Sequence, residues 1–323
     1  MAEVMQASPP KGKYLIDTYE DWAAGEGIPI LTGTALDLLS VESKPWARFG
    51  VDGAFCHLQG RDDFLSVLLL DLAPGARSTP QRHLFEAAFV ALAGGGTVEL
   101  ELGGAPARPI EWGANSLVLL PMNARYRLVN SSPERARLVL FSDLRYLLNL
   151  YRNEQFLFAT ETDFPERAAA ESLVRNIATL DMAGADRRSF DLAASALGCD
   201  LLALAPKSYG RARRQMQGAH LLAVAGTGYT RIGGASDGEA ERIDWRRGLL
   251  FAAPGMRFVQ HFNPGAAAAR LLDVQLGSER YPLFRSRRAA YGDSSVYAAG
   301  NAEIAKDQED PGIAAEFAAA CRV

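Results

Sequence analysis

An internal repeat constrains this chain more than any other feature of its sequence. The segment IEWGANSLVLLPMNARYRLVNSSPERARLVL, which begins at Ile110, aligns without a gap with IDWRRGLLFAAPGMRFVQHFNPGAAAARLLD, which begins at Ile243. Identical residues recur 133 positions apart at Trp112 and Trp245, Pro121 and Pro254, Asn130 and Asn263, and Arg137 and Arg270. Upstream, FVALAGGGTVEL from Phe89 matches LLAVAGTGYTRI from Leu221 at an offset of 132. This ordered set predicts two copies of one domain.

Each copy has the pattern of a β-domain. Runs such as FLSVLLLDL, AAFVALAG, TVELEL, SLVLLP and ARLVLF are short, apolar or alternating, and bounded by Gly, Pro, Asn or Ser. Such runs predict an all-β sandwich or barrel. The segment ERAAAESLVRNIATL, from Glu166, predicts a helix between the copies. A short helix is also predicted in DPGIAAEFAAACRV, with Asp310 as its cap and Pro311 as its first residue.

These patterns predict five parts of the chain. They are an N-terminal arm over 1–45, a first barrel over 46–150, a helical linker over 151–185, a second barrel over 186–285 and a C-terminal tail over 286–323. The length of 323 residues agrees with two domains of about 150 residues each.

Composition narrows the classes of function. The formal net charge of −4 lacks the basic excess of a nucleic-acid-binding protein. Cys56, Cys199 and Cys321 lie far apart, so neither a disulfide framework nor a zinc motif is predicted. No apolar run reaches the length of a membrane span, and the first residues lack the pattern of a secretion signal. We therefore expect a cytoplasmic protein that binds neither nucleic acid nor membrane.

The spacing of several residues resembles that of the cupin motifs. In the first copy, the first motif is matched by Gly75, Gln81, His83, Ala87 and Gly94, and the second by Asn115, Pro121, Asn123, Tyr126 and Asn130. In the second copy, the second motif is matched by Gly248, Pro254, Met256, Val259 and Asn263. The chain thus resembles a bacterial bicupin, and the resemblance implies two tandem cupin jelly-roll barrels with a helical linker and a short C-terminal helix.

The resemblance also implies a metal site whose ligands are mostly missing here. Cupins commonly hold iron, manganese, nickel or zinc with three His and one Glu. The first copy has Gln81, His83, Ala87 and Tyr126 at these positions. The second has Arg213, Gln215, His220 and Val259, if its loop is one residue longer. Because a metal needs about three protein ligands, we expect no metal and no other cofactor.

The second barrel holds the predicted functional site. His220, at a ligand position, is the first candidate for proton transfer, with Arg213 and Gln215 binding an oxyanion. His261 lies two residues past Val259, so strand alternation would point both to the barrel interior. There His261 either replaces the missing histidine or hydrogen-bonds a neighbouring strand as a core residue.

Further residues are candidates for the pocket wall. Val259, Phe251, Phe258 and Tyr229 are predicted to contact the ligand, because a barrel mouth needs an apolar lining. In the first barrel His83, Glu86 and Tyr126 form a possible acid/base cluster, but alternation places His83 and Glu86 on opposite faces. A structural role is expected for them.

Three functions are compatible with these residues. The favoured one is binding of a small organic molecule, anionic or aromatic, in the second barrel, with or without metal-independent acid/base chemistry of the isomerase, cyclase or lyase type. The second is a metal-dependent cupin oxidoreductase such as a dioxygenase, with ligands from unexpected positions. The third is a non-catalytic structural or regulatory protein. Cupins commonly pair through exposed strand edges, so a homodimer is expected.

Overall fold

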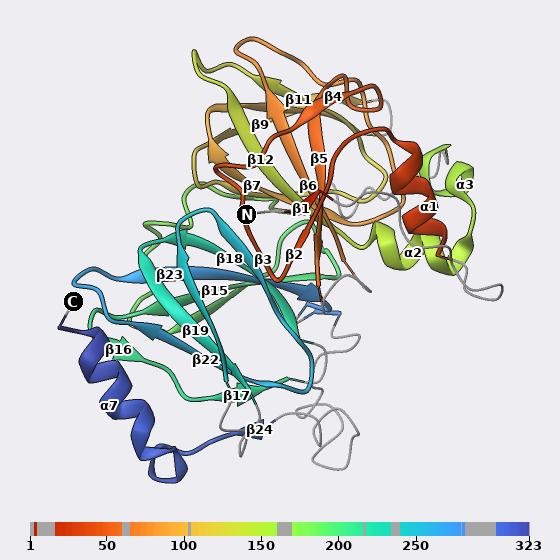
Figure 1. The fold of residues 1–323 in the computed structure, drawn as a ribbon. Helices are drawn as coiled ribbons and strands as arrows, with labels where there is room; N and C mark the ends of the chain where they lie inside the picture. The colour runs from red at the N-terminus through yellow and green to blue at the C-terminus, as the bar shows by residue number, and fades with distance from the viewer. Residues whose placement is uncertain are drawn as a thin grey trace. The chain divides into compact units, whose positions relative to one another are not determined.

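The structure is a computed structural model of the chain. It describes residues 3–4, 17–59, 65–102, 105–159, 170–215, 218–233, 240–278, 280–281 and 302–322. The chain divides into two compact units, the first comprising Met1–Thr179 with Asp191–Leu197 and the second Leu180–Phe190 with Gly198–Val323. Both are built mainly from antiparallel β-strands (Figure 1).

The first unit contains barrel 1 and three helices. Its elements are β1 Glu3–Val4, α1 Thr18–Gly25, β2 Ile30–Gly33, β3 Ala35–Asp37, β4 Lys44–Trp46, β5 Val51–Leu58, β6 Ser66–Leu72, β7 Ala87–Ala93, β8 Gly95–Leu102, β9 Ala105–Gly113, β10 Leu117–Leu120, β11 Arg125–Asn130, β12 Ala136–Ser142, α2 Leu144–Tyr151, α3 Glu154–Ala159 and β13 Leu173–Val174. One sheet has the order β1-β2-β5-β6-β12-β7-β10-β13, and the other has the order β11-β8-β9.

The second unit contains barrel 2. Its elements are β14 Arg187–Phe190, β15 Leu197–Leu204, β16 Ser208–Tyr209, β17 Arg213–Arg214, β18 Ala219–Ala225, β19 Thr227–Gly233, β20 Glu241–Arg246, β21 Leu249–Ala253, β22 Phe258–Asn263, β23 Ala269–Leu276, β24 Ala302–Glu303, the 3-10 turn η1 Lys306–Gln308 and α7 Pro311–Ala320. One sheet contains β14-β15-β23-β18-β21 in that order, and the other has the order β20-β19-β22-β17-β24. The predicted all-β fold with two barrels is confirmed.

The repeated asparagines explain part of the repeat. In each copy the buried side-chain amide of this residue donates to three backbone carbonyl groups, two on a distant segment and one four residues further along the chain. Asn130 donates to Leu72, Ala73 and Glu134 at 3.0, 3.0 and 2.8 Å, and Asn263 donates to Leu204, Ala205 and Ala267 at 3.0, 3.0 and 2.8 Å. An amide NH₂ group is required to bridge these carbonyls, so both copies keep asparagine.

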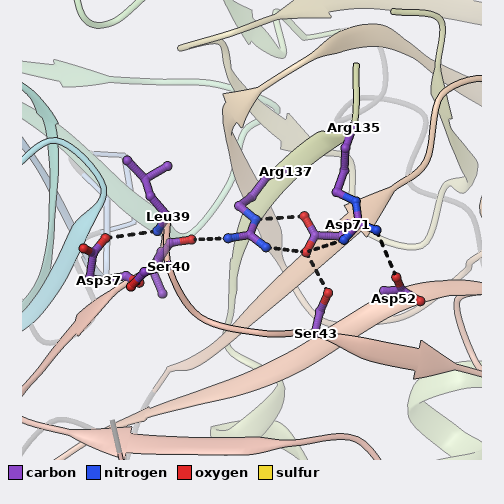
Figure 2. A network of polar contacts seen from close by, with 9 residues as sticks. Asp37, Leu39, Ser40, Ser43, Asp52, Asp71, Arg135 and Arg137 are labelled. Carbon is purple, nitrogen blue, oxygen red and sulfur yellow. Dashed lines mark hydrogen bonds and ion pairs between the residues drawn. The ribbon is translucent and has the colours of Figure 1, made fainter. Parts of the chain in front are cut away.

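A buried ion pair joins strands β12 and β6 of barrel 1. Arg137 on β12 donates from Nε and from one terminal nitrogen to the two carboxylate oxygens of Asp71 on β6, at 2.8 and 2.7 Å. The carboxylate of Asp71 is fully buried and also accepts from Ser43 Oγ at 2.7 Å. The other guanidinium nitrogen donates to the carbonyl of Leu38, on the segment that carries Leu39 and Ser40 (Figure 2). The pair thus joins the sheet to the chain segment that precedes β4.

The helices agree with the sequence in part. α7 begins at Pro311, and Asp310 caps it by accepting from Gly312 N at 2.8 Å, as predicted. The helices of this region, α2 and α3, lie N-terminal to the segment from Glu166 that was predicted to be helical. Of the segment from Glu166, residues 170–180 contain no helix, and Leu173–Val174 instead pairs with β10. Its alanine-rich part over 166–169 lies outside the described residues. No helix within the described ranges is long and apolar enough to cross a bilayer.

Candidate functional site

A cavity of about 740 Å³ lies within the second unit. Both sheets of barrel 2 contribute to its wall, the first through strands that include β14, β15 and β18 and the second through β17, β22 and β24. Small and aliphatic side chains line much of it, among them Leu202, Ala219, Leu221, Ala253 and Val259. The charged side chains of the lining are six basic, Arg187, Arg211, Arg213, Arg257, Arg270 and Lys306, and three acidic, Asp186, Asp273 and Glu303. The cavity is thus partly apolar, and its charged lining is predominantly basic.

Barrel 1 has large side chains where barrel 2 has the cavity. Phe89 and Tyr126 belong to the buried core of barrel 1. At the offsets of the repeat they correspond to Leu221 and Val259, two lining residues. An aliphatic side chain in place of an aromatic ring leaves volume unfilled in a closely packed interior. At these two positions the wall of the barrel 2 cavity thus has smaller side chains than the core of barrel 1.

A third difference places a cation in barrel 2. Gly53 on β5 pairs with Leu70, and Arg187 on β14 pairs with Leu202, 132 residues after Leu70. A Cβ atom at Gly53 would approach the ring of Trp46 to 2.8 Å, so the indole occupies that space in barrel 1. In barrel 2 the corresponding position carries a guanidinium group. The sequence reasoning missed Arg187, although aligning the first strands of the two copies would have found it.

Arg187 binds two buried carboxylates. Its Nε donates to Asp200 Oδ2 at 3.1 Å, and a terminal nitrogen donates both to that oxygen and to Asp273 Oδ2, the latter at 3.2 Å. Gln275 Nε2 also lies 3.5 Å from Asp200 Oδ2. Burial lowers the pKa of Arg187, but Asp273 and Asp200 outweigh it and raise the pKa above its ordinary value. Arg187 is therefore a permanent cation of the cavity wall.

His261 is held by a chain of hydrogen bonds on the facing sheet. Trp245 Nε1 donates to Thr230 Oγ1 at 2.9 Å, and Thr230 Oγ1 lies 2.8 Å from His261 Nδ1. Thr230 is fully buried, and its hydroxyl proton needs an acceptor, which neutral Nδ1 provides. This arrangement favours the tautomer that carries its proton on Nε2. His261 lines the cavity, so it acts there as a neutral hydrogen-bond donor.

We expect His261 to remain neutral down to about pH 4. Burial lowers its pKa to about 4, and the charges of Arg187 and Arg213 act in the same direction. In the unfolded chain this pKa is about 6.5. Between these values only the unfolded chain binds the proton, so the free energy of unfolding falls as the pH is lowered from 6.5 to 4. His83, whose pKa burial also lowers to about 4, adds to this effect.

NMR titration of the imidazole measures the pKa of His261, and urea unfolding between pH 7 and pH 4 measures the free energy of unfolding. A His261 resonance that titrates near pH 6.5 would contradict the half-buried, cation-flanked environment. Histidine-to-asparagine variants at positions 261 and 83 assign the two signals.

Arg211, Arg213 and Glu303 are part-exposed residues of the lining, and we call this part of the cavity its mouth. Its basic groups are partly neutralised. Arg213 on β17 donates from Nε to Glu303 Oε2 at 2.8 Å, and Arg211 donates to Glu303 Oε1 at 2.6 Å. These hydrogen bonds, that of Arg211 foremost, lower the pKa of Glu303. Both arginine side chains are about half exposed. Arg213, which the sequence predicted to bind an oxyanion, is thus paired with Glu303 in this structure.

The structure brings together only some of the predicted site residues. Arg213, Gln215, Val259 and His261 line the cavity. His220 does not, because it lies on β18 between Ala219 and Leu221, which do line it, and alternation directs its side chain to the other face of the strand. The expectation that His220 points into the cavity is thus corrected.

Three aromatic candidates also lie outside the lining. Phe251 is fully buried on β21, and Phe258 lies on β22 with the guanidinium of Arg214 5.2 Å from its ring. Tyr229 lies on β19, stacks on Phe262 with ring centroids 4.5 Å apart, and has Arg242 3.8 Å above its ring. Tyr229 is next to Thr230 on β19, and Phe262 is next to His261 on β22. Because neighbouring side chains on a strand point to opposite faces, Tyr229 and Phe262 face away from the cavity.

The ligand positions of barrel 1 take part in its core. His83 Nε2 lies 3.0 Å from the Tyr126 hydroxyl, and His83 Nδ1 lies 2.9 Å from the carbonyl oxygen of Phe85. The rings of His83 and Phe85 are stacked with centroids 3.6 Å apart. Gln81 donates from its side chain to the carbonyl of Arg48 at 2.9 Å. Each of these polar groups forms a hydrogen bond within the protein itself.

Comparison with solved structures identifies the fold. A tryptophan-to-tyrosine variant of oxalate decarboxylase from Bacillus subtilis matches with a TM-score of 0.54 and 12% sequence identity, over 76% of this chain and 77% of that chain. A structure of the same Bacillus subtilis enzyme, studied for its Mn(II) centres, matches over the same shares with a TM-score of 0.53 and 12% identity. No family model and no curated protein matches the chain. The chain has the fold of a bicupin.

This comparison corrects the expectation that no cofactor is involved. Solved structures with this fold include Mn(II) enzymes, so the fold points to a metal cofactor. The residues of this chain do not fit a metal at the usual cupin positions. Of the side chains at those positions, only His83 and His220 are of the histidine or carboxylate type that holds a cupin metal. Among the described residues, no three His, Cys, Asp or Glu side chains gather as a metal site. We derive no reaction step through a metal.

Proposed function

We propose that barrel 2 binds a small organic anion in its cavity. The observation that carries the proposal is the charge of the lining, in which basic side chains outnumber acidic ones by six to three. Guanidinium groups bind carboxylates and other oxyanions with short, charge-assisted hydrogen bonds. The volume of about 740 Å³ lies within the range of small-molecule pockets.

The interior suits a ligand with an apolar body. Leu221, Val259 and Ala253 offer aliphatic surface, and His261 offers a neutral N–H donor in the same cavity. A carboxylate attached to an aromatic or aliphatic group would place its charge among the arginines and its body against these walls. The ligand class is therefore an organic carboxylate or a chemically similar oxyanion.

His261 takes the role that the sequence assigned to His220. It is neutral at pH 7, and its proton lies on the nitrogen that Thr230 does not contact. A donor that is already oriented stabilises negative charge as it develops on a bound oxygen, because no reorganisation is needed. Turnover of the isomerase, cyclase or lyase type remains a prediction, in which His261 would hold or move the proton and Arg187 would supply the fixed positive charge.

Arg257 offers the sharpest test of binding. It lines the cavity and is exposed, and among the described residues it has no hydrogen bond or ion pair. We expect Arg257→Ala to weaken the binding of 4-bromobenzoate about fivefold, the effect of one partly exposed ion pair. Isothermal titration calorimetry measures the change in Kd.

The control is Arg125→Ala in barrel 1, at an arginine that is likewise exposed and lies 3.7 Å from Glu101. This variant should bind 4-bromobenzoate as the unaltered protein does. Equal loss in both variants, or undetectable binding of every carboxylate tested by the unaltered protein, would refute the proposal.

A further inference from the structure

A C-terminal segment lies across one side of barrel 2. Its strand β24 pairs with β17, with Glu303 opposite Arg213, and Ile304 N donates to the carbonyl of Ala212 at 2.9 Å. The turn η1 follows, with Lys306 Nζ 4.2 Å from the centre of the Tyr209 ring. In Figure 1, β24 lies beside β17 and α7 lies beside β16 and β22. Glu303 and Lys306 are part of the cavity lining.

The far end of this segment is fixed by contacts that do not involve the cavity arginines. Phe317 of α7 packs against Tyr209 and Phe262, with ring centroids 4.8 and 6.0 Å apart. Glu316 accepts from Arg231 at 2.5 Å. Glu309, just before α7, accepts from the Tyr209 hydroxyl at 2.9 Å and thus holds the segment without lining the cavity.

The near end is held differently. β24 has two residues, and its side-chain anchor is the carboxylate of Glu303, which accepts one hydrogen bond from Arg211 and one from Arg213. All three residues line the cavity. Their side chains are about one third to one half exposed, so these ion pairs are weak enough for another anion to replace.

We propose that Glu303 is a specificity-determining residue that occupies the anion site on Arg211 and Arg213 until a ligand displaces it. This inference rests on the proposed function, because the ligand must itself be an anion. A ligand with a single carboxylate only takes the place of the Glu303 carboxylate on the two arginines, and the displaced carboxylate stays nearby. Such a ligand therefore gains little net electrostatic attraction. A ligand with a second negative charge also gains the attraction of Arg257, which lines the cavity outside the displaced segment. The mouth therefore selects ligands with two negative charges.

Two aromatic acids of the same scaffold test this charge rule. We expect the unaltered protein to bind phthalate, a dianion, at least about fivefold more tightly than benzoate, a monoanion. In Glu303→Gln the two arginines lose the charged partner that they have among the described residues, so benzoate should bind about fivefold more tightly than to the unaltered protein. Glu303→Asp, which keeps the charge, should not show this gain.

Glu309→Gln is the matched control, because it weakens the attachment of the same segment without freeing a cavity arginine. Calorimetry gives the Kd values, and hydrogen exchange of residues 302–309 reports whether the segment is displaced. We expect phthalate to increase exchange in these residues, and Glu303→Gln to increase it without ligand.

The outcomes separate the two proposals. Anion binding with unchanged or reduced exchange in residues 302–309, and no gain in Glu303→Gln, would overturn the displacement while leaving the anion site intact. An equal gain in Glu309→Gln would overturn the role of the Glu303 charge. If neither the unaltered protein nor Glu303→Gln binds any of these anions, both proposals fail. Binding by Glu303→Gln alone would support both.

Discussion

Replacing Arg187 with alanine is expected to lower the free energy of unfolding by about 3 kcal/mol, because it removes the cation from two buried carboxylates. Asp200 is fully buried and Asp273 nearly so, and the Arg187 side chain is 24% exposed. The same change should raise the pKa of His261, since the charge of Arg187 is one cause of its lowered value. Urea unfolding at pH 7 and NMR titration of His261 measure the two effects.

The neighbouring arginine provides the control for this variant. Arg188 lies next to Arg187 on β14 but is exposed, and its guanidinium contacts the carbonyl of Asp181 at 3.2 Å and the ring of Phe190. Arg188→Ala should change stability by at most about 0.5 kcal/mol and leave the pKa of His261 unchanged. Similar losses in both variants would show that Arg187 does not hold the two carboxylates in place.

Replacing Arg137 with alanine is expected to cost about 3 to 5 kcal/mol, because the carboxylate of Asp71 would be left buried without its two-point partner. Figure 2 shows the guanidinium between this carboxylate and the segment that carries Leu39 and Ser40. The variant also leaves the Leu38 carbonyl without its side-chain donor. Urea unfolding, with the slope compared between variants, measures the loss.

Arg135 is the matched control, two residues away on the same side of barrel 1. Its guanidinium lies 3.9 Å from both Asp52 and Asp71, and its side chain is 56% exposed. Arg135→Ala should therefore change the free energy of unfolding by less than about 1 kcal/mol. If Arg137→Ala lowers the free energy of unfolding as little as Arg135→Ala does, the buried pair of Arg137 and Asp71 does not stabilise barrel 1 as we expect.

The repeat made the fold predictable from the sequence. Short apolar runs between turn residues predicted strands, and the recurrence of Asn130 as Asn263 has a physical cause that both copies share. The helix from Glu166 was misplaced because alanine content and spacing favour a helix locally, whereas residues 170–180 are irregular apart from a two-residue strand that pairs with β10. Pairing with a distant strand can override local helix propensity.

The site was harder to predict, because it depends on the face of each strand. His220 and His261 both lie on strands of barrel 2, but the pairing of Leu221 with Asp273 puts Leu221 on the cavity side and His220 on the other. A shift of one residue in the assumed register exchanges the two faces. Arg187 was missed because its strand precedes the recognised repeat, and the role of Glu303 depends on a contact 90 residues from Arg213.

The central claim is that barrel 2, and not barrel 1, holds a pocket for an organic anion. Crystals grown with 4-bromobenzoate, measured at the bromine absorption edge, locate the ligand directly. We predict one bromine position inside barrel 2, against the aliphatic wall of Leu221 and Val259, with the carboxylate toward the arginines of the mouth. A bromine position inside barrel 1, or only on the outer surface of the protein, would contradict the account.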